Sequence, residues 1–173
     1  MRIISIDPGY ERLGIAILEK VASSATRRGG GKETLIFSEC FKTSSKLPHH
    51  ERLTLIGNRI KEIIKKWKPE QLATEKLFFS GNQKTAMLVA EARGVILYTG
   101  SSLGLEVFEY TPNQVKIAIT GYGRSEKRQM IEMVKKLIRV TSKTKSDDEF
   151  DAIAIGLTHF AISRTPKSGE FLR

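Results

Sequence analysis

The spacing of hydrophobic residues changes near Leu53, and this change limits the folds that the chain can adopt. Before it, short β-branched runs are separated by turn signals, the first of which is Asp7-Pro8-Gly9. These runs predict three strands in a meander, at residues 1–6, 13–18 and 34–41. After it, helical spacing alternates with short runs that predict two further strands. This order predicts an α/β fold in which helices flank a mixed five-stranded sheet.

The later elements follow from the same spacing. Pro69 ends the first helix, and Ser125 begins the third as its N-cap. The second helix carries three small residues at i, i+4 and i+8, and such a ridge allows another helix to approach closely. These residues are Ala86, Ala90 and Gly94. The expected strands are 72–76 and 105–110, and the expected helices are 53–67, 85–98, 125–138 and 148–163.

The length of 173 residues predicts one domain over 1–173, with a flexible basic hairpin tip at about 20–33 and a loose C-terminal tail at about 164–173. The formal net charge of +10 favours a polyanionic partner. The single cysteine, Cys40, is typical of a reducing compartment. No apolar run approaches the roughly 20 residues that span a bilayer, and Asp7 interrupts the region where a signal peptide would be apolar. We therefore expect a cytoplasmic protein without a membrane partner.

Four acidic residues stand at unusual places for so basic a chain. Asp7 ends an apolar strand beside a glycine turn, and Glu75 ends the short strand that follows Pro69. Asp148 and Asp151 are spaced i, i+3, so a helix presents both on one face. If the first and fourth strands are neighbours, all four carboxylates meet at one end of the sheet.

Clustered carboxylates repel one another, by roughly 4 kcal/mol for two charges about 4 Å apart at an effective dielectric of about 20. A divalent cation removes that cost, and an all-oxygen ligand set favours Mg²⁺ or Mn²⁺ over zinc. Acids in a basic chain suit metal-dependent phosphodiester hydrolysis, in which lysines and arginines hold the backbone phosphates. Taken singly, the same acids have ordinary explanations: a turn former, a solvated strand end and charges that complement a helix dipole.

In their order along the chain, these residues and others resemble the RuvC-type Holliday junction resolvases, and the likeness covers nearly the whole length. The segments that carry it are Ile6-Asp7-Pro8-Gly9 with Gly14, Glu75-Lys76-Leu77-Phe78, Ala92-Arg93-Gly94, Glu109-Tyr110, Gln114-Val115-Lys116, Glu126-Lys127 and Asp148-Glu149-Phe150-Asp151-Ala152 with Thr158-His159. The resemblance implies a ribonuclease-H-like fold and a homodimer. It also implies an endonuclease that nicks two symmetric strands of four-way DNA junctions in recombination and repair, leaving 5′-phosphate ends.

The resemblance implies a ligand set as well. The family's catalytic, metal-binding carboxylates fall on Asp7, Glu75, Asp148 and Asp151, with two Mg²⁺ ions per subunit and Mn²⁺ able to substitute. Asp147 lies i, i+4 from Asp151, but the D-x-x-D-A frame favours Asp148. The helix at 85–98 corresponds to the family's dimer interface, although its small residues would equally suit packing against the helix that begins near Leu53. The implied partner is the RuvA–RuvB branch-migration complex.

Residues for DNA binding are implied in the same way. Phe78 matches an aromatic that wedges among bases, and the alternative is a core residue beside Leu77 and Phe79. Lys116 and Lys127 match lysines near the scissile phosphate, and either could instead be a solvated surface lysine. Arg124 and Arg128 flank Lys127 and would widen the grip on phosphates.

One loop and one histidine stand apart from these metal-binding and DNA-binding residues. The segment 27–31, Arg-Arg-Gly-Gly-Gly, is longer than the usual hairpin of the family and is either a disordered loop or an extra DNA contact. His159 follows Asp151 on the same predicted helix and lies roughly on its face. We expect a structural role for His159 rather than a role as a metal ligand.

Three other classes of protein share some of these sequence features. A ribosomal-RNA-processing nuclease of the YqgF type shares the early Asp-Gly turn, but such chains are usually shorter and lack the Glu126-Lys127 and Thr158-His159 pattern. An actin-like ATPase has a similar turn but needs two duplicated domains, for which 173 residues are too few. A non-catalytic junction-binding module would explain the charge but leaves four placed carboxylates without a reason.

Overall fold

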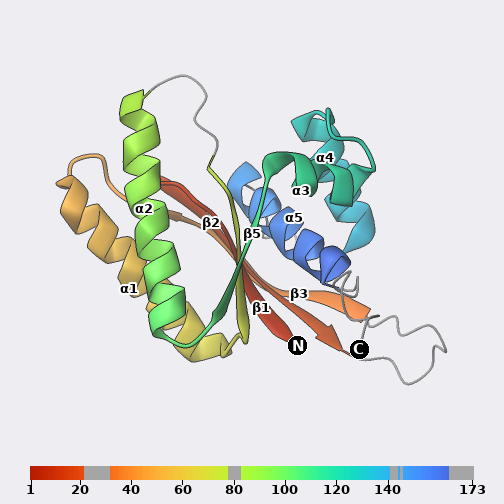
Figure 1. The fold of residues 1–173 in the computed structure, drawn as a ribbon, viewed down its shortest axis with the longest axis horizontal. Helices are drawn as coiled ribbons and strands as arrows, with labels where there is room; N and C mark the ends of the chain where they lie inside the picture. The colour runs from red at the N-terminus through yellow and green to blue at the C-terminus, as the bar shows by residue number, and fades with distance from the viewer. Residues whose placement is uncertain (22–31, 78–82, 141–143, 145, 164–173) are drawn as a thin grey trace, which may run out of the picture.

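The computed structural model describes residues 1–21, 32–77, 83–140, 144 and 146–163 of the chain. Helices cover both faces of a central sheet (Figure 1). The strands are β1 (Arg2–Asp7), β2 (Arg12–Val21), β3 (Lys32–Lys42), β4 (Gln71–Glu75) and β5 (Glu106–Tyr110). The helices are α1 (His49–Trp67), α2 (Gln83–Ser102), α3 (Pro112–Thr120), α4 (Lys127–Leu137) and α5 (Asp147–Ile162). The predicted α/β class is confirmed.

The sheet has the strand order β3-β2-β1-β4-β5, so β1 is central. The first three strands form the predicted antiparallel meander, whereas β4 lies parallel to β1 and β5 lies parallel to β4. The parallel strands are reached through crossovers that contain α1 and α2, as parallel pairing requires. The expectation that the first and fourth strands are neighbours is therefore confirmed.

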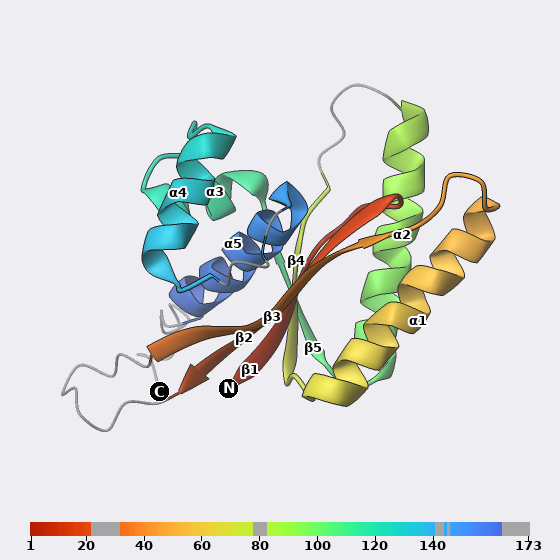
Figure 2. The same cartoon turned by 180° about the vertical axis from the view of Figure 1, so that it is seen from behind.

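The sheet is buried on both faces. Helices α1 and α2 cover one face, and α5 with α3 and α4 covers the other (Figures 1 and 2). Side chains alternate along β1, so Ile4 and Ile6 enter the core under α1 and α2, while Ile3 enters the core under α5. This double burial explains why the first strand has an almost continuous apolar sequence.

The Gly94 end of the small-residue ridge of α2 does not meet α1. A Cβ atom at Gly57 of α1 would lie 3.2 Å from Val95 Cγ1 and 3.7 Å from Thr99 Oγ1, so these two side chains mark the α1 contact. Gly94 is exposed, and a Cβ atom there would meet no described heavy atom within 4 Å. The part of the ridge at Gly94 therefore lies open, and the alternative of packing against α1 does not apply there.

Helix α3 was missed by the sequence prediction, which used Pro112 only as the end of a strand. Pro112 instead occupies the first turn of α3, where proline loses no helical hydrogen bond. Thr111 is the N-cap and accepts a hydrogen bond from the Gln114 backbone N–H at 3.1 Å. In return, the Gln114 side chain accepts from the Thr111 backbone N–H at 2.8 Å. This capping box was the available signal.

The prediction that Ser125 caps the next helix was wrong. Helix α4 begins at Lys127 with Glu126 as its N-cap, and Gln129 Oε1 accepts a hydrogen bond from the Glu126 backbone N–H at 2.9 Å. Ser125 is buried one residue earlier, where its hydroxyl donates to the Tyr122 carbonyl at 2.6 Å. Its polar side chain therefore closes the loop between α3 and α4 rather than the helix.

Most of the expected hairpin tip and all of the expected tail lie outside the described residues. Of the tip expected at about 20–33, residues 20 and 21 belong to β2 and residues 32 and 33 belong to β3. The remaining residues, 22–31, and the tail, 164–173, are not described. Within the described ranges, none of the helices combines the length and apolar character needed to cross a membrane.

Candidate active site

Two parallel strands end side by side with an acidic residue. Asp7 is the last residue of β1 and Glu75 is the last residue of β4. The register pairs Ile6 with Thr74, so the next residue of each strand lies at the same edge of the sheet. Asp7 shares a face with Ile3, and Glu75 shares a face with Ala73, and both of these apolar residues belong to the core under α5. Both carboxylates therefore lie on the α5 side.

Gly14 allows the first turn of α5 to reach this edge. It pairs with Asp7 across the β1–β2 ladder. A Cβ atom at Gly14 would lie 2.0 Å from the Asp148 backbone oxygen and 3.2 Å from Asp7 Cβ. Only a residue without a side chain lets the start of α5 lie directly on the strand that neighbours Asp7. Ser146 caps the helix there by accepting from the Glu149 backbone N–H at 3.2 Å.

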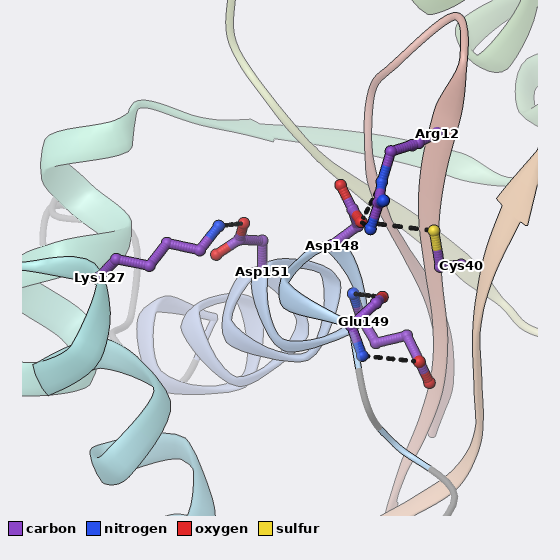
Figure 3. Close-up of polar contacts among 7 residues, drawn as sticks. Arg12, Cys40, Lys127, Asp148, Glu149 and Asp151 are labelled. Atoms are coloured by element: carbon purple, nitrogen blue, oxygen red, sulfur yellow. Dashed lines mark hydrogen bonds and ion pairs between the residues drawn. The ribbon is translucent and has the colours of Figure 1, made fainter.

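Asp148 is directed toward β2 and β3. Its Oδ2 atom accepts two hydrogen bonds from Arg12, from Nε at 2.9 Å and from Nη2 at 2.5 Å. The Cys40 thiol of β3 donates to the same oxygen at 3.3 Å. Asp151 points the other way along α5 and forms an ion pair with Lys127 of α4 (Figure 3). The two aspartates of the helix are thus held by cations on opposite sides.

The pKa of the Asp7 carboxyl is raised well above its ordinary value. Burial is the largest cause, because it disfavours the charged form, and repulsion from Asp151, Glu75 and Asp148 follows in that order. The Lys127 ammonium opposes this effect only in part. The other three carboxylates therefore act on the buried Asp7, although the four lie on three separate segments of the chain.

The other three carboxyls differ in their surroundings. Burial and repulsion from Asp151 raise the pKa of Glu75 to about 7, against attraction from two lysines. Burial also raises the pKa of Asp151, although its bond to Lys127 works against the rise. Burial would raise the pKa of Asp148 too, but its hydrogen bonds to Arg12 and Cys40 outweigh burial and lower it. Asp148 is thus the one member of the set whose ionised form is favoured.

These groups fit an oxygen-bound divalent cation. Raised carboxyl pKa values at the end of the central strand mark a place where positive charge is needed, and hard cations prefer carboxylate oxygens. In the part of the chain that the structure describes, no three acidic, histidine or cysteine side chains converge closely enough to hold an ion as they stand. A bound ion would therefore require side chains of this set to change rotamer.

Two cavities lie beside the carboxylates. The larger, of about 860 Å³, is bordered by Asp148 and by three cationic residues, Arg12, Lys42 and Lys127. The smaller, of about 250 Å³, is lined by Glu75 and Asp151 together with Lys116 and Lys127. Lys127 borders both. Each cavity therefore combines carboxylates with cations, as a site for a metal-bound phosphate requires.

The other predicted residues are placed as follows. Lys116 of α3 and Lys127 of α4 are brought to Glu75 and Asp151, as the smaller cavity shows. Arg124 and Arg128 are exposed, in the α3–α4 loop and the first turn of α4. Phe78 lies outside the described residues.

Asp147 and Asp148 were the two choices for one ligand position. Asp147 is exposed, whereas the Asp148 backbone lies against Gly14 and its carboxylate reaches Arg12. The backbone of Asp148 thus lies directly beside the strand pair that carries Asp7, and the choice between the two residues as metal ligand stays a prediction.

Arg12 and Cys40 were not singled out from the sequence, yet both contact Asp148. A signal for Arg12 existed, because it lies three residues after Gly9 of the Asp7-Pro8-Gly9 turn and begins the next strand. Cys40 could be found only from the register, which pairs it with Gly14.

His159 is fully buried and has a structural role. Gln71 Nε2 donates to Glu106 Oε2 at 3.1 Å, so Gln71 Oε1 faces the imidazole and accepts from His159 Nε2 at 2.8 Å. His159 Nδ1 then accepts from the Tyr110 hydroxyl at 2.7 Å. Both ring nitrogens are used in this neutral tautomer, and burial lowers the pKa of His159 to about 4.

We predict that His159 makes the fold sensitive to acid. Its folded pKa lies below the ordinary value, so its contribution is complete above about pH 6.5 and is lost as the pH falls toward 4. Between about pH 7 and pH 4.5, the wild type is expected to lose about 1–2 kcal/mol more unfolding free energy than His159→Gln. Urea unfolding at both pH values measures this, with the exposed His50→Gln as the control. Equal losses in wild type and His159→Gln would contradict it.

The chain was compared with known proteins. It matches the family model of the crossover junction endodeoxyribonuclease RuvC over residues 3–159. It is 44% identical over 159 residues to the crossover junction endodeoxyribonuclease RuvC of Halothermothrix orenii, covering 92% of each chain. The corresponding protein of Fusobacterium nucleatum is 42% identical over 159 residues, which cover 92% of this chain and 80% of that one.

Solved structures give the same result. Thermus thermophilus RuvC in complex with Holliday junction substrate has a TM-score of 0.83 and 32% identity, and the match covers 95% of both chains. The yeast mitochondrial Holliday junction resolvase has a TM-score of 0.61 over 92% of this chain and 76% of that one. Its identity is 9%, so this second likeness shows a shared fold alone.

Proposed function

This chain belongs to the RuvC family of crossover junction endodeoxyribonucleases, and from that premise we propose which of its residues carry out the reaction and with which ions. It is a Holliday junction resolvase with a ribonuclease-H-like fold. The four carboxylates Asp7, Glu75, Asp148 and Asp151 would hold two Mg²⁺ ions, for which Mn²⁺ can substitute. The observation that carries this assignment is the raised pKa of Asp7, a buried carboxyl that the other three surround with negative charge.

When bound, the ions would supply an activated water and charge stabilisation for the departing oxygen. Asp7 would be the shared ligand of the site, because it ends the central strand and feels the charge of each of the other three carboxylates. Lys116 and Lys127 line the cavity that contains Glu75 and Asp151, and they would hold the scissile phosphate there. In-line attack on the phosphodiester leaves a 5′-phosphate and a 3′-hydroxyl.

Cleavage of a labelled synthetic four-way junction tests the proposal. The junction is incubated with Mg²⁺, Mn²⁺ or EDTA, beside linear duplex DNA and single-stranded RNA of matching sequence, and denaturing gels locate the nicks. We expect paired, symmetric nicks on the junction alone, and only with a divalent ion. Cleavage of the RNA instead would favour an RNA-processing nuclease. Tight junction binding without cutting under either ion would favour a binding module.

We further propose that the outer face of α2 joins two copies of the chain. A twofold pair matches two equivalent cut sites on a four-way junction. The ridge is open at Gly94, and the exposed side chains Met87 and Tyr98 add apolar surface to the same helix. Exposed apolar surface of this kind favours an interface. A RuvA–RuvB complex is the motor with which such a dimer would work.

Ala90→Phe is expected to weaken this dimer. A large ring on the ridge would hold the two helices apart, at a cost of about 1–3 kcal/mol, which raises the dimer dissociation constant by roughly 5- to 150-fold. Sedimentation equilibrium measures the constant. Leu55→Phe, at an exposed position of α1, is the control and should leave it unchanged. An Ala90→Phe protein with wild-type dimer affinity would reject this face as the interface.

A further inference from the structure

Arg12 occupies a position that the proposed metal-binding role of Asp148 leaves unexplained. Its guanidinium directs both Nε and Nη2 to Oδ2 of Asp148, and the Cys40 thiol directs a third hydrogen bond to that atom. These three hydrogen bonds leave Oδ2 no lone pair for a cation, so an ion could reach this carboxylate only through Oδ1. Arg12 therefore occupies one of the two oxygens with which Asp148 could bind a metal ion.

The ion pair between Arg12 and Asp148 is weak enough to be broken easily. The Arg12 side chain is 49% exposed, whereas that of Asp148 is 22% exposed. An ion pair with one partner in water is weak, so the guanidinium leaves at little cost once another anion is offered. The contact thus neutralises Asp148 in the free protein without holding it permanently.

The backbone beside Arg12 is fixed, so release means a turn of the side chain alone. Thr43 Oγ1 donates to the Tyr10 carbonyl at 2.6 Å, and Nη2 of the buried Arg52 donates to the same carbonyl at 3.2 Å. The Thr43 backbone N–H also donates to the Glu11 carbonyl at 3.0 Å. These bonds hold residues 10 and 11, and residue 12 begins the β2 ladder.

The cavity next to this contact is lined by both cations and carboxylates. It holds about 860 Å³ and is bordered by Arg12, Lys42 and Lys127 together with Glu39, Asp147, Asp148 and Glu149, so Arg12 is one of three cations that a phosphate could reach there. A guanidinium pairs with phosphate oxygens through the same two N–H groups that it now gives to Asp148. A backbone phosphate that enters the cavity would therefore compete directly with Asp148 for Arg12.

We propose that Arg12 is a positioning residue that keeps Oδ2 of Asp148 from binding a divalent ion until a DNA phosphate draws the guanidinium away. The proposal rests on the proposed function of Asp148 and adds an order of events. Binding of DNA frees the Asp148 oxygen, and the ion completes its ligand set only with substrate in place. The free protein then has a weaker metal site than its four carboxylates would otherwise provide.

Calorimetric titration of Mn²⁺ into metal-stripped protein without DNA tests this. Arg12→Gln is expected to bind Mn²⁺ roughly 3- to 10-fold more tightly than the wild type, since the gain equals the lost competition from an exposed ion pair. Lys42→Gln removes the same charge from the same cavity without a bond to Asp148, so it is the matched control and should show a smaller gain. In Arg12→Gln with Asp148→Asn, the gain should disappear.

A second measurement follows junction binding in EDTA as a function of salt. Arg12→Gln should reduce the slope of log affinity against log salt by about one, because one phosphate contact is lost. An unchanged slope would show that Arg12 stays on Asp148, which overturns the proposal. So would an Arg12→Gln protein whose Mn²⁺ affinity equals that of Lys42→Gln. Wild-type protein that neither binds Mn²⁺ nor cuts the junction would instead overturn the proposed function itself.

Discussion

Asp7→Asn is expected to lower junction cleavage by about 10³-fold or more while leaving junction binding intact or stronger. The carboxylate is proposed as the shared ligand of the site, and the loss of several kcal/mol of charge stabilisation corresponds to this factor. The amide has nearly the same shape, so the fold is kept. Single-turnover cleavage with Mg²⁺ and a binding titration in EDTA separate the two effects.

The melting temperature of Asp7→Asn tests the burial of the Asp7 charge independently of cleavage. The pKa of Asp7 is raised by folding, so its ionised form costs stability at neutral pH, and that cost is absent below the ordinary pKa. Removing the charge should raise the Tm of the metal-free protein by roughly 2–4 °C. Asp147→Asn changes an exposed acid on the same helix and should keep most of the cleavage. A variant that loses binding and stability together would show that Asp7 is structural.

Gly14→Ala has the second large expected effect. The added Cβ atom would lie 2.0 Å from a backbone oxygen, so the start of α5 must move away from β2 by about 1 Å. A shift of that size costs about 10²-fold in rate when it misplaces groups that must act together, here Asp148 relative to Asp7. We also expect a loss of about 1–3 kcal/mol in unfolding free energy, because backbone cannot yield as a side chain does.

Urea unfolding and cleavage rates measure both losses. Asn58→Ala, at an exposed position of α1, is the control for stability, because alanine favours a helix by up to about 0.7 kcal/mol over asparagine. It should therefore be slightly more stable than the wild type. Wild-type stability and cleavage in Gly14→Ala would contradict the close approach of α5 to the sheet.

Much of the fold could be predicted because each strand and most helices carry their own local signal. The turn at Asp7-Pro8-Gly9 and the change of spacing near Leu53 separated the meander from the crossovers, and the structure has both. Helix α3 was missed, since a proline after a strand was used as a stop signal although proline also begins helices. A proline that can either end a strand or begin a helix cannot be assigned to one of these roles without the surrounding fold.

Only part of the candidate site could be predicted from the sequence. Residues that end strands, such as Asp7 and Glu75, could be placed because parallel neighbours end at one edge of the sheet. The partners of Asp148 could not, since Arg12 and Cys40 reach it across more than 100 residues of sequence and through the register of β2 with β3. Such contacts depend on side-chain direction, which a linear pattern does not contain.

The origin of the carboxylates in three distant segments has a consequence for synthesis. A nascent chain that has emerged only as far as α4 already contains Asp7, Glu75 and the lysines proposed to bind phosphate, but it lacks Asp148 and Asp151. It also lacks α5, which packs on the core under one face of the sheet. On the proposed assignment, nuclease activity is therefore expected only after α5 has been synthesised. A product that ends before α5 would leave the apolar sheet residues that pack against this helix uncovered.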